Sequence, residues 1–411
     1  MRDQKSDNKR RKKTGLDYFL IFWFSLLFVL AVGLGGLYLA GSLHRSAEKP
    51  GEEQAKEESI KLGKPVPEAI PKKEEEPAEE EPAPAEEAPE PEPGKSVTIA
   101  FAGDILFDSG YAVMSTVSKN GGDIRSAFSP ELMEEMQSAD LFLINNEFPY
   151  TTRGEPLPGK LFTFRAKPET ANYLKEMGAD LVNLANNHAS DYGEVSLLDT
   201  LDVLDSVGIP HIGAGHDLEE ASKPFYYNEG DLTIGIVSAT QIEKLDIPDT
   251  KGATESSAGV FRCWKIEPLL EVIREARQHC DFLVVFIHWG TENQEEIDWA
   301  QKDQGPKIAE AGADLIVGAH PHILQKIDVV DGVPVFYSLG NFLFNSKTID
   351  TGLLEAVISP EGELSELKFL PALQSGCRTE LLSGEEKERI LAHLRAISTG
   401  VSIDEEGVIT W

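Results

Sequence analysis

Side chains that can bind a metal follow five short apolar runs of this sequence, at the point where each run ends. Each run has the length of a buried β-strand, and the polar residues at the ends are Asp, Glu, Asn and His. In chain order they are Asp104 after VTIAFAG, Glu147 after ADLFLINN, Asn187 and His188 in ADLVNLANNH, His288 in CDFLVVFIHWG, and His320 and His322 in ADLIVGAHPH. Because open α/β sheets bind ligands at the carboxyl ends of their strands, this pattern predicts a metal centre at one sheet edge.

The mixture of ligand types indicates which metals fit. Carboxylate oxygen, amide oxygen and imidazole nitrogen together suit Mn²⁺, Fe²⁺ or Zn²⁺, whereas Ca²⁺ and Mg²⁺ prefer sites built from oxygen. Either one or two ions are compatible with the set, and paired ions can clamp the attacking and leaving oxygens of a displacement. A carboxylate between two ions, here Glu147, could bridge them. A histidine close to the metals but not bound to them could protonate a leaving group.

Each of these residues also has a purely structural interpretation. Asp104 could be a turn residue, the asparagines could cap turns, and His288 could be a satisfied polar group at a strand end. His320 and His322 are separated by one proline, and an extended His-x-His segment would point both rings to the same side. That pair is therefore the strongest argument for a metal.

The elements that must position these residues alternate between strand-like and helical patterns from Val97 onward, which is typical of an α/β domain. Amphipathic periodicity predicts helices at 129–137, 168–177, 195–207, 267–279, 298–311 and 384–398. Hairpins are expected around Glu229-Gly230-Asp231 and around Asp331-Gly332, and strands at 353–358 and 364–370. These strand pairs predict a second sheet packed on the first.

Composition limits the function classes. The chain has 411 residues and a net charge of −32, which argues against nucleic acid as a partner because phosphate backbones attract Lys and Arg. The three cysteines, Cys263, Cys280 and Cys377, match neither a zinc ribbon nor a small disulfide scaffold, although two of them could pair outside the cytoplasm.

The N-terminal residues have the composition of a membrane anchor and a tether. A basic tail at 1–17 precedes the uncharged run Tyr18–Ala40, which is long enough to cross a bilayer, and a Glu/Pro-rich segment follows at 41–95. Basic residues before the span predict a cytoplasmic N-terminus, a single-pass protein of the cell membrane and an extracellular body. A cleaved signal peptide is the alternative, but the apolar run is longer than its usual core. The expected folded domain is 96–375, with a C-terminal appendage at 376–411.

Six motifs, in order, resemble the CapA/PgsA family of capsule and poly-γ-glutamate biosynthesis, which is itself similar to calcineurin-like metallophosphoesterases. They are AFAGD ending at Asp104, NNEFP at 145–149, NLANNH at 183–188, HWGTE at 288–292, GAHPH at 318–322 and YSLGNFLF at 337–344. The resemblance covers about residues 97–345, and the anchor with its exported domain resembles Gram-positive members.

The resemblance implies a β-sandwich core flanked by helices (αββα), with the metal site at the strand ends. By this comparison the positions that match metal ligands are Asp104, Glu147, Asn187, His288, His320 and His322. His188 matches the residue that contacts the leaving group, and Asn341 and Glu292 belong to motifs of the CapA-like group; these three are the expected catalytic residues.

The sequence also departs from the phosphoesterase pattern. Where that pattern has Asp-x-His, the third residue here is Leu106, and the bridging Asp is replaced by Glu147. Asp108 could substitute for the missing ligand. One metal ion, or a weakly held second one, is therefore compatible with the residues.

Three functions follow as hypotheses. The first is a membrane-anchored, metal-dependent hydrolase or transferase that acts on an anionic envelope polymer, with poly-γ-glutamate as the case that the resemblance implies. The second is a non-catalytic accessory subunit beside a membrane polymer synthase. The third is a phosphoesterase on envelope phosphodiesters. Any polyanion would need local cations, such as the metals and the basic loop that carries Arg153, Lys160, Arg165 and Lys167.

Overall fold

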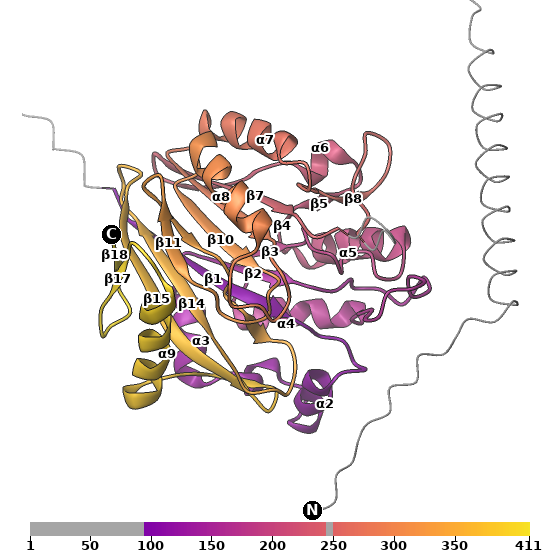
Figure 1. The fold of residues 1–411 in the computed structure, drawn as a ribbon. Coiled ribbons are helices and arrows are strands. Elements are labelled where there is room, and N and C mark those ends of the chain that lie inside the picture. The colour runs from indigo at the N-terminus through magenta and orange to yellow at the C-terminus, as the bar shows by residue number, and fades with distance from the viewer. Residues whose placement is uncertain (1–93, 244–249) are drawn as a thin grey trace, which may run out of the picture. The chain divides into compact units, whose positions relative to one another are not determined.

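The computed structural model describes residues 94–243 and 250–411, which form the coloured ribbon of Figure 1. The anchor expected at Tyr18–Ala40 and nearly all of the expected linker lie outside these residues, and so does the basic tail. Within the two described ranges, no helix is both long enough and apolar enough to span a bilayer.

Eight strands form the first sheet, in the order β16-β15-β14-β1-β2-β3-β4, with β13 also paired to β1. β1, β2, β3 and β4 are parallel, whereas β14, β15 and β16 continue the sheet in antiparallel pairs. The strands are β1 (Val97–Ile105), β2 (Leu141–Asn146), β3 (Leu181–Asn183), β4 (His211–Ile212), β13 (Asn341–Leu343), β14 (Ile349–Ile358), β15 (Leu364–Ser375) and β16 (Arg378–Leu381).

Six strands form the second sheet, in the order β11-β12-β10-β9-β7-β6. Its centre is parallel, and the hairpins β11–β12 and β6–β7 supply the antiparallel pairs. The strands are β6 (Phe225–Glu229), β7 (Leu232–Thr240), β9 (Phe282–His288), β10 (Leu315–Ala319), β11 (Ile327–Val330) and β12 (Val333–Phe336). Two small ribbons pair β5 (Ala214–Gly215) with β8 (Gly259–Val260) and β17 (Ser402–Ile403) with β18 (Ile409–Thr410).

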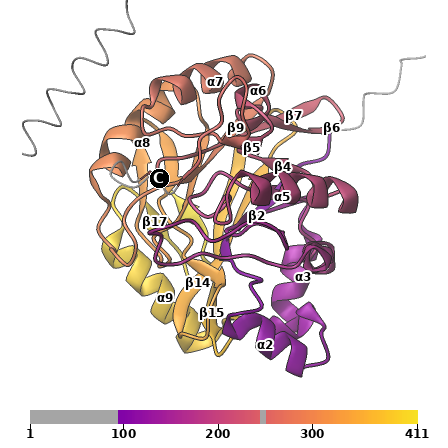
Figure 2. The ribbon, with the colours of Figure 1, turned by 90° about the vertical axis from the view of Figure 1, so that its right-hand side faces the viewer.

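Most of the helices cover the outer faces of the two sheets. The described helices are α2 (Ala112–Lys119), α3 (Pro130–Ser138), α4 (Asn172–Met177), α5 (Glu194–Val207), α6 (Leu218–Ala221), α7 (Glu267–Arg277), α8 (Trp299–Ala311) and α9 (Gly384–Ile397), with 3₁₀ turns η1 (Ile124–Ala127) and η2 (Pro168–Ala171). Figure 2 shows α7 and α8 on one side of the paired sheets, away from α3 and α5. The layers are therefore helix, sheet, sheet, helix.

Period-two alternation in the central strands explains this layering. In β1, Phe101 joins the core between the two sheets, while its neighbour Ala102 joins the core under α3, α4 and α5. In β9, Phe286 faces the first sheet and Ile287 faces α7 and α8. Because both faces of each central strand are buried, the strands read as continuous apolar runs. The expected mixed α/β sandwich flanked by helices is confirmed.

Most of the expected elements are present, and the helix expected at 168–177 is divided into η2 and α4. Asp331 and Gly332 have φ of 51° and 89° in the β11–β12 turn, as a tight hairpin of this kind requires. Short helices α2 and α6 were not predicted. Residues 376–411, expected as an appendage, supply β16 to the first sheet, and Ile390 and Leu394 of α9 to the core between the sheets. The other domain boundaries stay predictions.

The three cysteines are free in the structure. Cys263 and Cys377 are buried, and Cys280 is half-buried. Burial raises the pKa of the Cys263 thiol above its ordinary value, so it behaves as an apolar core residue rather than as a reactive thiolate.

Candidate metal centre

The strand-end residues meet where the ends of the two sheets come together. Asp104 lies near the end of β1, Glu147 follows β2, and Asn187 and His188 follow β3, all on the first sheet. The three other histidines come from the second sheet: His288 ends β9, and His320 and His322 follow β10. The expectation of a single sheet edge is therefore wrong. The ligands face one another across the sandwich, which allows them to surround an ion.

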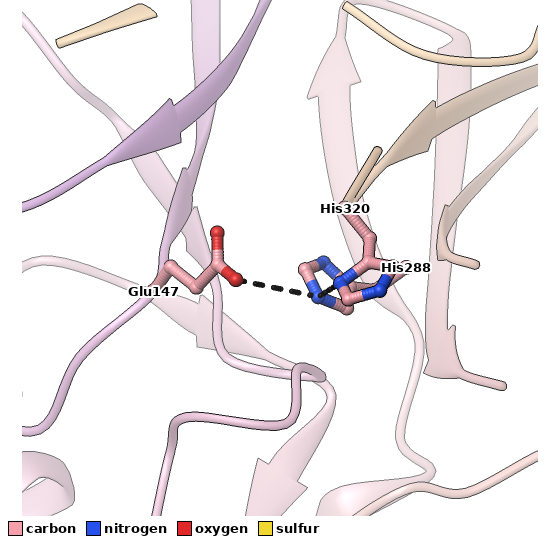
Figure 3. Close-up of side chains that lie close together, drawn as sticks. All are labelled: Glu147, His288 and His320. Carbon is pink, nitrogen blue, oxygen red and sulfur yellow. Dashed lines mark hydrogen bonds and ion pairs between the residues drawn. The ribbon is translucent and has the colours of Figure 1, made fainter. Parts of the chain in front are cut away.

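Glu147, His288 and His320 form the first group that could hold a metal, and each is buried. The Nδ1 atom of His320 lies 3.1 Å from Nε2 of His288, and this Nε2 lies 3.6 Å from Oε1 of Glu147. In Figure 3 the Glu147 carboxylate points across the gap toward the two imidazoles, which come from the other sheet. One oxygen and two nitrogens converging in this way are suited to a transition metal or Zn²⁺.

Asp104, Glu147 and His322 form a second such group, so Glu147 is shared by both. Oδ2 of Asp104 lies 3.0 Å from Nδ1 of His322, and Oδ1 of Asn341 lies 2.9 Å from the same nitrogen. A residue shared by two groups could bridge two ions, and the bridging role of Glu147 stays a prediction. Both a one-ion and a two-ion centre remain compatible with this arrangement.

The Glu147 side chain supplies the test of whether a cation fits here. The residue is fully buried, and neither of its carboxylate oxygens has a hydrogen-bond partner among the described residues. Burial, followed by the charge of Asp104, raises the pKa of Glu147 well above its ordinary value. A buried carboxylate without partners is costly, because the lost hydration is not replaced. A divalent cation between the two groups would supply the missing partner, so the residues fit a metal.

Close backbone packing brings the second group together. The backbone N–H of Asp104 donates to the carbonyl of Gly340 at 3.0 Å, and a Cβ on Gly103 would lie 1.8 Å from that carbonyl oxygen. Gly103 therefore allows β1 to approach the turn before β13. This approach places Asp104 and Asn341 in register and aims both at His322.

An asparagine network holds the strand ends in place. Asn145 donates from Nδ2 to Oδ1 of Asp104 at 2.6 Å, and its own Oδ1 accepts from Nδ2 of Asn183 at 2.8 Å. Asn186 donates to the backbone carbonyl of Asn146 at 2.9 Å and accepts from the backbone N–H of His188 at 3.0 Å. These asparagines thus link the strand ends, and Asn186 also closes a local turn through the His188 N–H.

The expectation of an extended His-Pro-His segment is wrong. His320 and His322 have φ of 99° and 61°, a conformation that non-glycine residues seldom adopt. The turn sends the two rings to different groups, His320 toward His288 and His322 toward Asp104. Strained backbone of this kind concentrates at functional sites.

Burial controls the protonation of two of the histidines. It lowers the pKa of His288 well below its ordinary value, and the neighbouring His320 acts in the same direction. Burial also lowers the pKa of His188, against the opposing charge of Asp191. Neutral imidazoles are the form that binds metals and accepts protons, so both residues are in the useful state near pH 7.

His322 behaves differently from these two. Burial disfavours its charged form, but the hydrogen bond to Asp104 and the negative charge of that carboxylate outweigh this, and the pKa of His322 is raised. Asp104 therefore favours the protonated form of His322.

His188 is held by Asp191, a residue not predicted for the site, and Asp191 in turn pairs with Lys160 of the basic loop. Its Nδ1 lies 2.7 Å from Oδ2 of Asp191, and the other oxygen of Asp191 lies 2.7 Å from Nζ of Lys160, whose side chain is almost fully buried. The Phe164 ring packs on the imidazole with centroids 4.3 Å apart. Asp191 could have been found from its position three residues after His188. Lys160 was predicted only as part of a basic loop that would bind a polyanion, and no local pattern indicates its pairing with Asp191.

The remaining predicted residues lie around this centre. Oδ1 of Asn187 lies 2.9 Å from Nε2 of His288, within the first group. Glu292 is exposed at the mouth of the site, where two cavities meet.

Leu106 and Asp108 were considered for the histidine position of the Asp-x-His pattern, and neither belongs to the metal-capable groups of the described residues. Leu106 is buried in the core beneath the helices. Asp108 accepts backbone N–H bonds from Gly110 at 2.6 Å and Arg165 at 2.8 Å, and it belongs to neither metal-capable group of the described residues. Its expected substitution as a ligand is not supported.

Comparisons with known proteins agree on one family. Residues 98–346 match the sequence model of "Bacterial capsule synthesis protein PGA_cap". The chain is 31% identical over 274 residues to "PGA biosynthesis protein CapA" of Bacillus subtilis (strain 168), covering 65% of this chain and 69% of that protein. It is 29% identical over 315 residues to "Capsule biosynthesis protein CapA" of Bacillus anthracis, covering 73% of each.

More distant similarities are also found. A "Probable polyglutamine synthesis accessory protein" of Mycobacterium tuberculosis (strain ATCC 25618 / H37Rv) is 26% identical over 287 residues, covering 64% of this chain and 74% of that protein. Among solved structures, a hypothetical protein from Thermus thermophilus aligns with a TM-score of 0.40 and 10% identity over 67% of this chain and 99% of its own. The 5'-nucleotidase of Candida albicans SC5314 aligns with a TM-score of 0.33 and 12% identity over 65% and 53%. Scores this low say nothing about the site.

Proposed function

Because this chain belongs to the bacterial capsule synthesis protein PGA_cap family, we propose that it is a metal-dependent hydrolase or transferase that acts on an anionic capsule polymer such as poly-γ-glutamate. The observation that carries the proposal is the buried Glu147 carboxylate, without hydrogen-bond partners among the described residues, between two groups of ligand atoms from different sheets. The residues that would hold the metal are Asp104, Glu147, Asn187, His288, His320 and His322.

A bound divalent cation would polarise a carbonyl or phosphoryl oxygen of the substrate. The chain's own contribution is proton handling by His188. The Nδ1–H of the neutral ring donates to Asp191, which leaves Nε2 with a free electron pair, 3.9 Å from Oε1 of Glu147. This nitrogen can accept a proton from an attacking group and return it to a leaving group.

Asn341 and Glu292 take different parts in this proposal. Asn341 holds His322 in place from the β13 side. Glu292, at the mouth, would contact the substrate rather than the metal, since it belongs to neither ligand group of the described residues.

Metal titration tests the centre directly. We expect the purified chain to bind Mn²⁺ or Zn²⁺ with one or two ions per molecule, measured by calorimetry and elemental analysis. His320→Ala should lower the affinity or the stoichiometry, whereas His279→Ala, an exposed histidine just after α7, should not. A wild-type chain that binds neither ion would disprove the metal centre.

A second candidate function is a non-catalytic accessory role in polymer synthesis, which fits the name of the mycobacterial relative, a probable polyglutamine synthesis accessory protein. Such a subunit would hold or guide the polymer beside a membrane synthase. Complementation separates the two candidates. If His188→Ala restores polymer to a deletion strain as fully as the wild type does, the accessory role holds. If the His188→Ala protein is folded but polymer is lost, the result supports catalysis.

The location outside the cell is also a proposal. It rests on the basic tail, the uncharged run Tyr18–Ala40 and the acidic tether. Protease added to intact protoplasts should remove the folded body and leave the N-terminal tail protected. Full protection of the body would place it in the cytoplasm.

A further inference from the structure

Two cavities open onto the candidate metal centre, and both are lined by Glu292. The first, of about 400 Å³, we call the lysine arm; it is lined by His188, His322 and Asn341 from the centre and by Lys347. The second, of about 340 Å³, we call the tryptophan arm; it is lined by Asn187 and His320 from the centre and by Trp264 and Trp299. Asn187 lines the tryptophan arm and the next residue, His188, lines the lysine arm; His320 and His322 are divided in the same way. Both arms therefore lead to the same centre.

The lysine arm is suited to a chain that carries anions. The Lys347 side chain is exposed and makes no ion pair with any described residue, so its ammonium group is available. Glu292 is the one acidic residue among the described residues that line the arm. The rings of Phe164 and Phe344 form an apolar wall, with centroids 5.6 Å apart, and Phe162 beside them is 55% exposed.

The tryptophan arm is the more acidic of the two. Glu243, Glu292 and Asp298 line it, and no lysine or arginine does so among the described residues. Arg262 pairs with Glu243. Among the described residues, the Asp298 carboxylate is bound by neutral groups alone, the N–H groups at the start of α8 and the Thr291 hydroxyl. The Trp264 and Trp299 rings meet edge to face with centroids 5.4 Å apart, and Trp299 is 57% exposed.

We propose that a polyanionic chain is recognised by its end: its terminal units fill the lysine arm and stop at the centre, and the tryptophan arm receives a neutral or cationic group with a flat apolar face. This inference rests on the proposed function, which supplies the anionic polymer. Each further glutamate unit would bring one more carboxylate beside the acidic side chains of the tryptophan arm. Like charges at contact distance in a partly desolvated cleft repel strongly enough to reject that unit.

The first test compares chains with and without ends, by calorimetry on the full-length protein with Mn²⁺ present. The probes are linear γ-linked dodecaglutamate and its head-to-tail cyclic form, which has the same repeating unit and almost the same charge. End recognition predicts at least tenfold weaker binding of the cyclic form. Lys347→Glu should weaken binding of the linear form about tenfold, whereas Lys175→Glu, an exposed residue of α4 that lines neither arm, should not.

The second test addresses the tryptophan arm with linear dodecaglutamates that carry a neutral aromatic amide at one end or the other. One of the two should bind several-fold more tightly than the unmodified chain. Trp299→Ala should abolish this gain, and Trp411→Ala, which changes a tryptophan that is 51% exposed elsewhere, should retain it.

The outcomes separate this inference from the proposed function. Equal affinity for linear and cyclic chains, or a gain that survives Trp299→Ala, overturns end recognition and leaves the anionic substrate in place. If neither chain binds while Mn²⁺ does, both the inference and the polymer substrate are wrong, and the metal centre stands.

Discussion

At the scale of single residues, the site depends on groups that are poorly satisfied without a ligand. Glu147 is buried without a hydrogen-bond partner among the described residues, and His320 and His322 hold unusual backbone angles. Such features cost stability and persist where function requires them. The surrounding asparagines, by contrast, have well-defined partners and fix the geometry.

Glu147→Gln should change two measured quantities in opposite directions. Metal affinity should fall at least a hundredfold, because the shared anionic ligand is lost. The unfolding free energy of the metal-free protein should rise by about 1–3 kcal/mol, since a neutral amide is cheaper to bury than an unpaired carboxylate. Urea unfolding in the presence of EDTA measures the second effect, with Glu361→Gln in an exposed turn as control. A less stable metal-free variant would contradict this account of Glu147.

Asp191→Asn should alter the tautomer of His188. In the wild type the carboxylate accepts from Nδ1–H and fixes the proton on that nitrogen. An amide can donate as well as accept, so the variant should show a mixture of tautomers in ¹⁵N-detected NMR of the ring. Asp205→Asn, at a surface carboxylate near His211, should leave the His188 signals unchanged. An unchanged tautomer in Asp191→Asn would remove Asp191 from the positioning role.

At the scale of elements, the strand ends carry the ligands and the glycines of the motifs set how closely these ends approach. Gly103 and Gly340 bring β1 against the turn before β13, and β9 and β10 deliver the histidines from the other sheet. The antiparallel strands β14 and β15 contribute no metal ligand to the groups found among the described residues, and they extend the first sheet away from the centre. They provide the framework rather than the chemistry.

Gly103→Ala should destabilise the fold and weaken metal binding together. The added methyl group would meet the Gly340 carbonyl at 1.8 Å, so β1 and this turn must separate. We expect a loss of about 1–3 kcal/mol in unfolding free energy, as for other overpacked sites. Gly305→Ala is a control, since Gly305 lies in α8 without a positive φ and the added methyl group would meet no heavy atom closer than 3.6 Å. Equal losses for the two variants would show that close packing at Gly103 is not the cause.

Glu355 on β14 should make stability fall as pH rises. Burial, followed by the charge of Glu135, raises the pKa of Glu355 from 4.5 to about 7, although Lys368 opposite it acts the other way. The folded state therefore binds the Glu355 proton more tightly than the unfolded state does. The stability that this proton contributes to the folded state is lost as pH rises from about 4.5 to about 7. Glu355→Gln should stabilise the protein by about 1 kcal/mol at pH 8 and by less at pH 4.5. This figure is smaller than the full pKa shift implies, because Glu355 is partly exposed and solvent screens its charge. Urea unfolding of both proteins at the two pH values measures this difference. An equal effect at both pH values would contradict this account of Glu355.

At the scale of the whole folded body, the centre joins two sheets that otherwise meet through apolar packing. Phe101, Phe286 and Val317 belong to the core between the sheets, and this core ends where the ligands begin. A metal at this position would cross-link the two sheets at one end. Metal binding is therefore expected to stabilise the body as a unit.

Removal of the metal should lower the melting temperature of the body in a single transition. An ion at one hundred times its dissociation constant stabilises the folded state by about 2.7 kcal/mol. Differential scanning calorimetry with and without EDTA should show this shift for the wild type and little or none for His320→Ala. A shift of the same size in His320→Ala would place the stabilising ion elsewhere.

The sequence by itself determined the ligand types, their order, the alternation of strands and helices, and the family. These properties are local: an apolar run of strand length and the polar residue that ends it are read from neighbouring positions. The tertiary structure alone decided that the ligands come from two facing sheets, that Glu147 is shared, and that Lys160 and Asp191 support His188. It also decided that acidic side chains gather in the tryptophan arm and that Lys347 lies in the other arm. These relations join residues distant in the chain, and packing between the sheets, rather than local pattern, sets their distances.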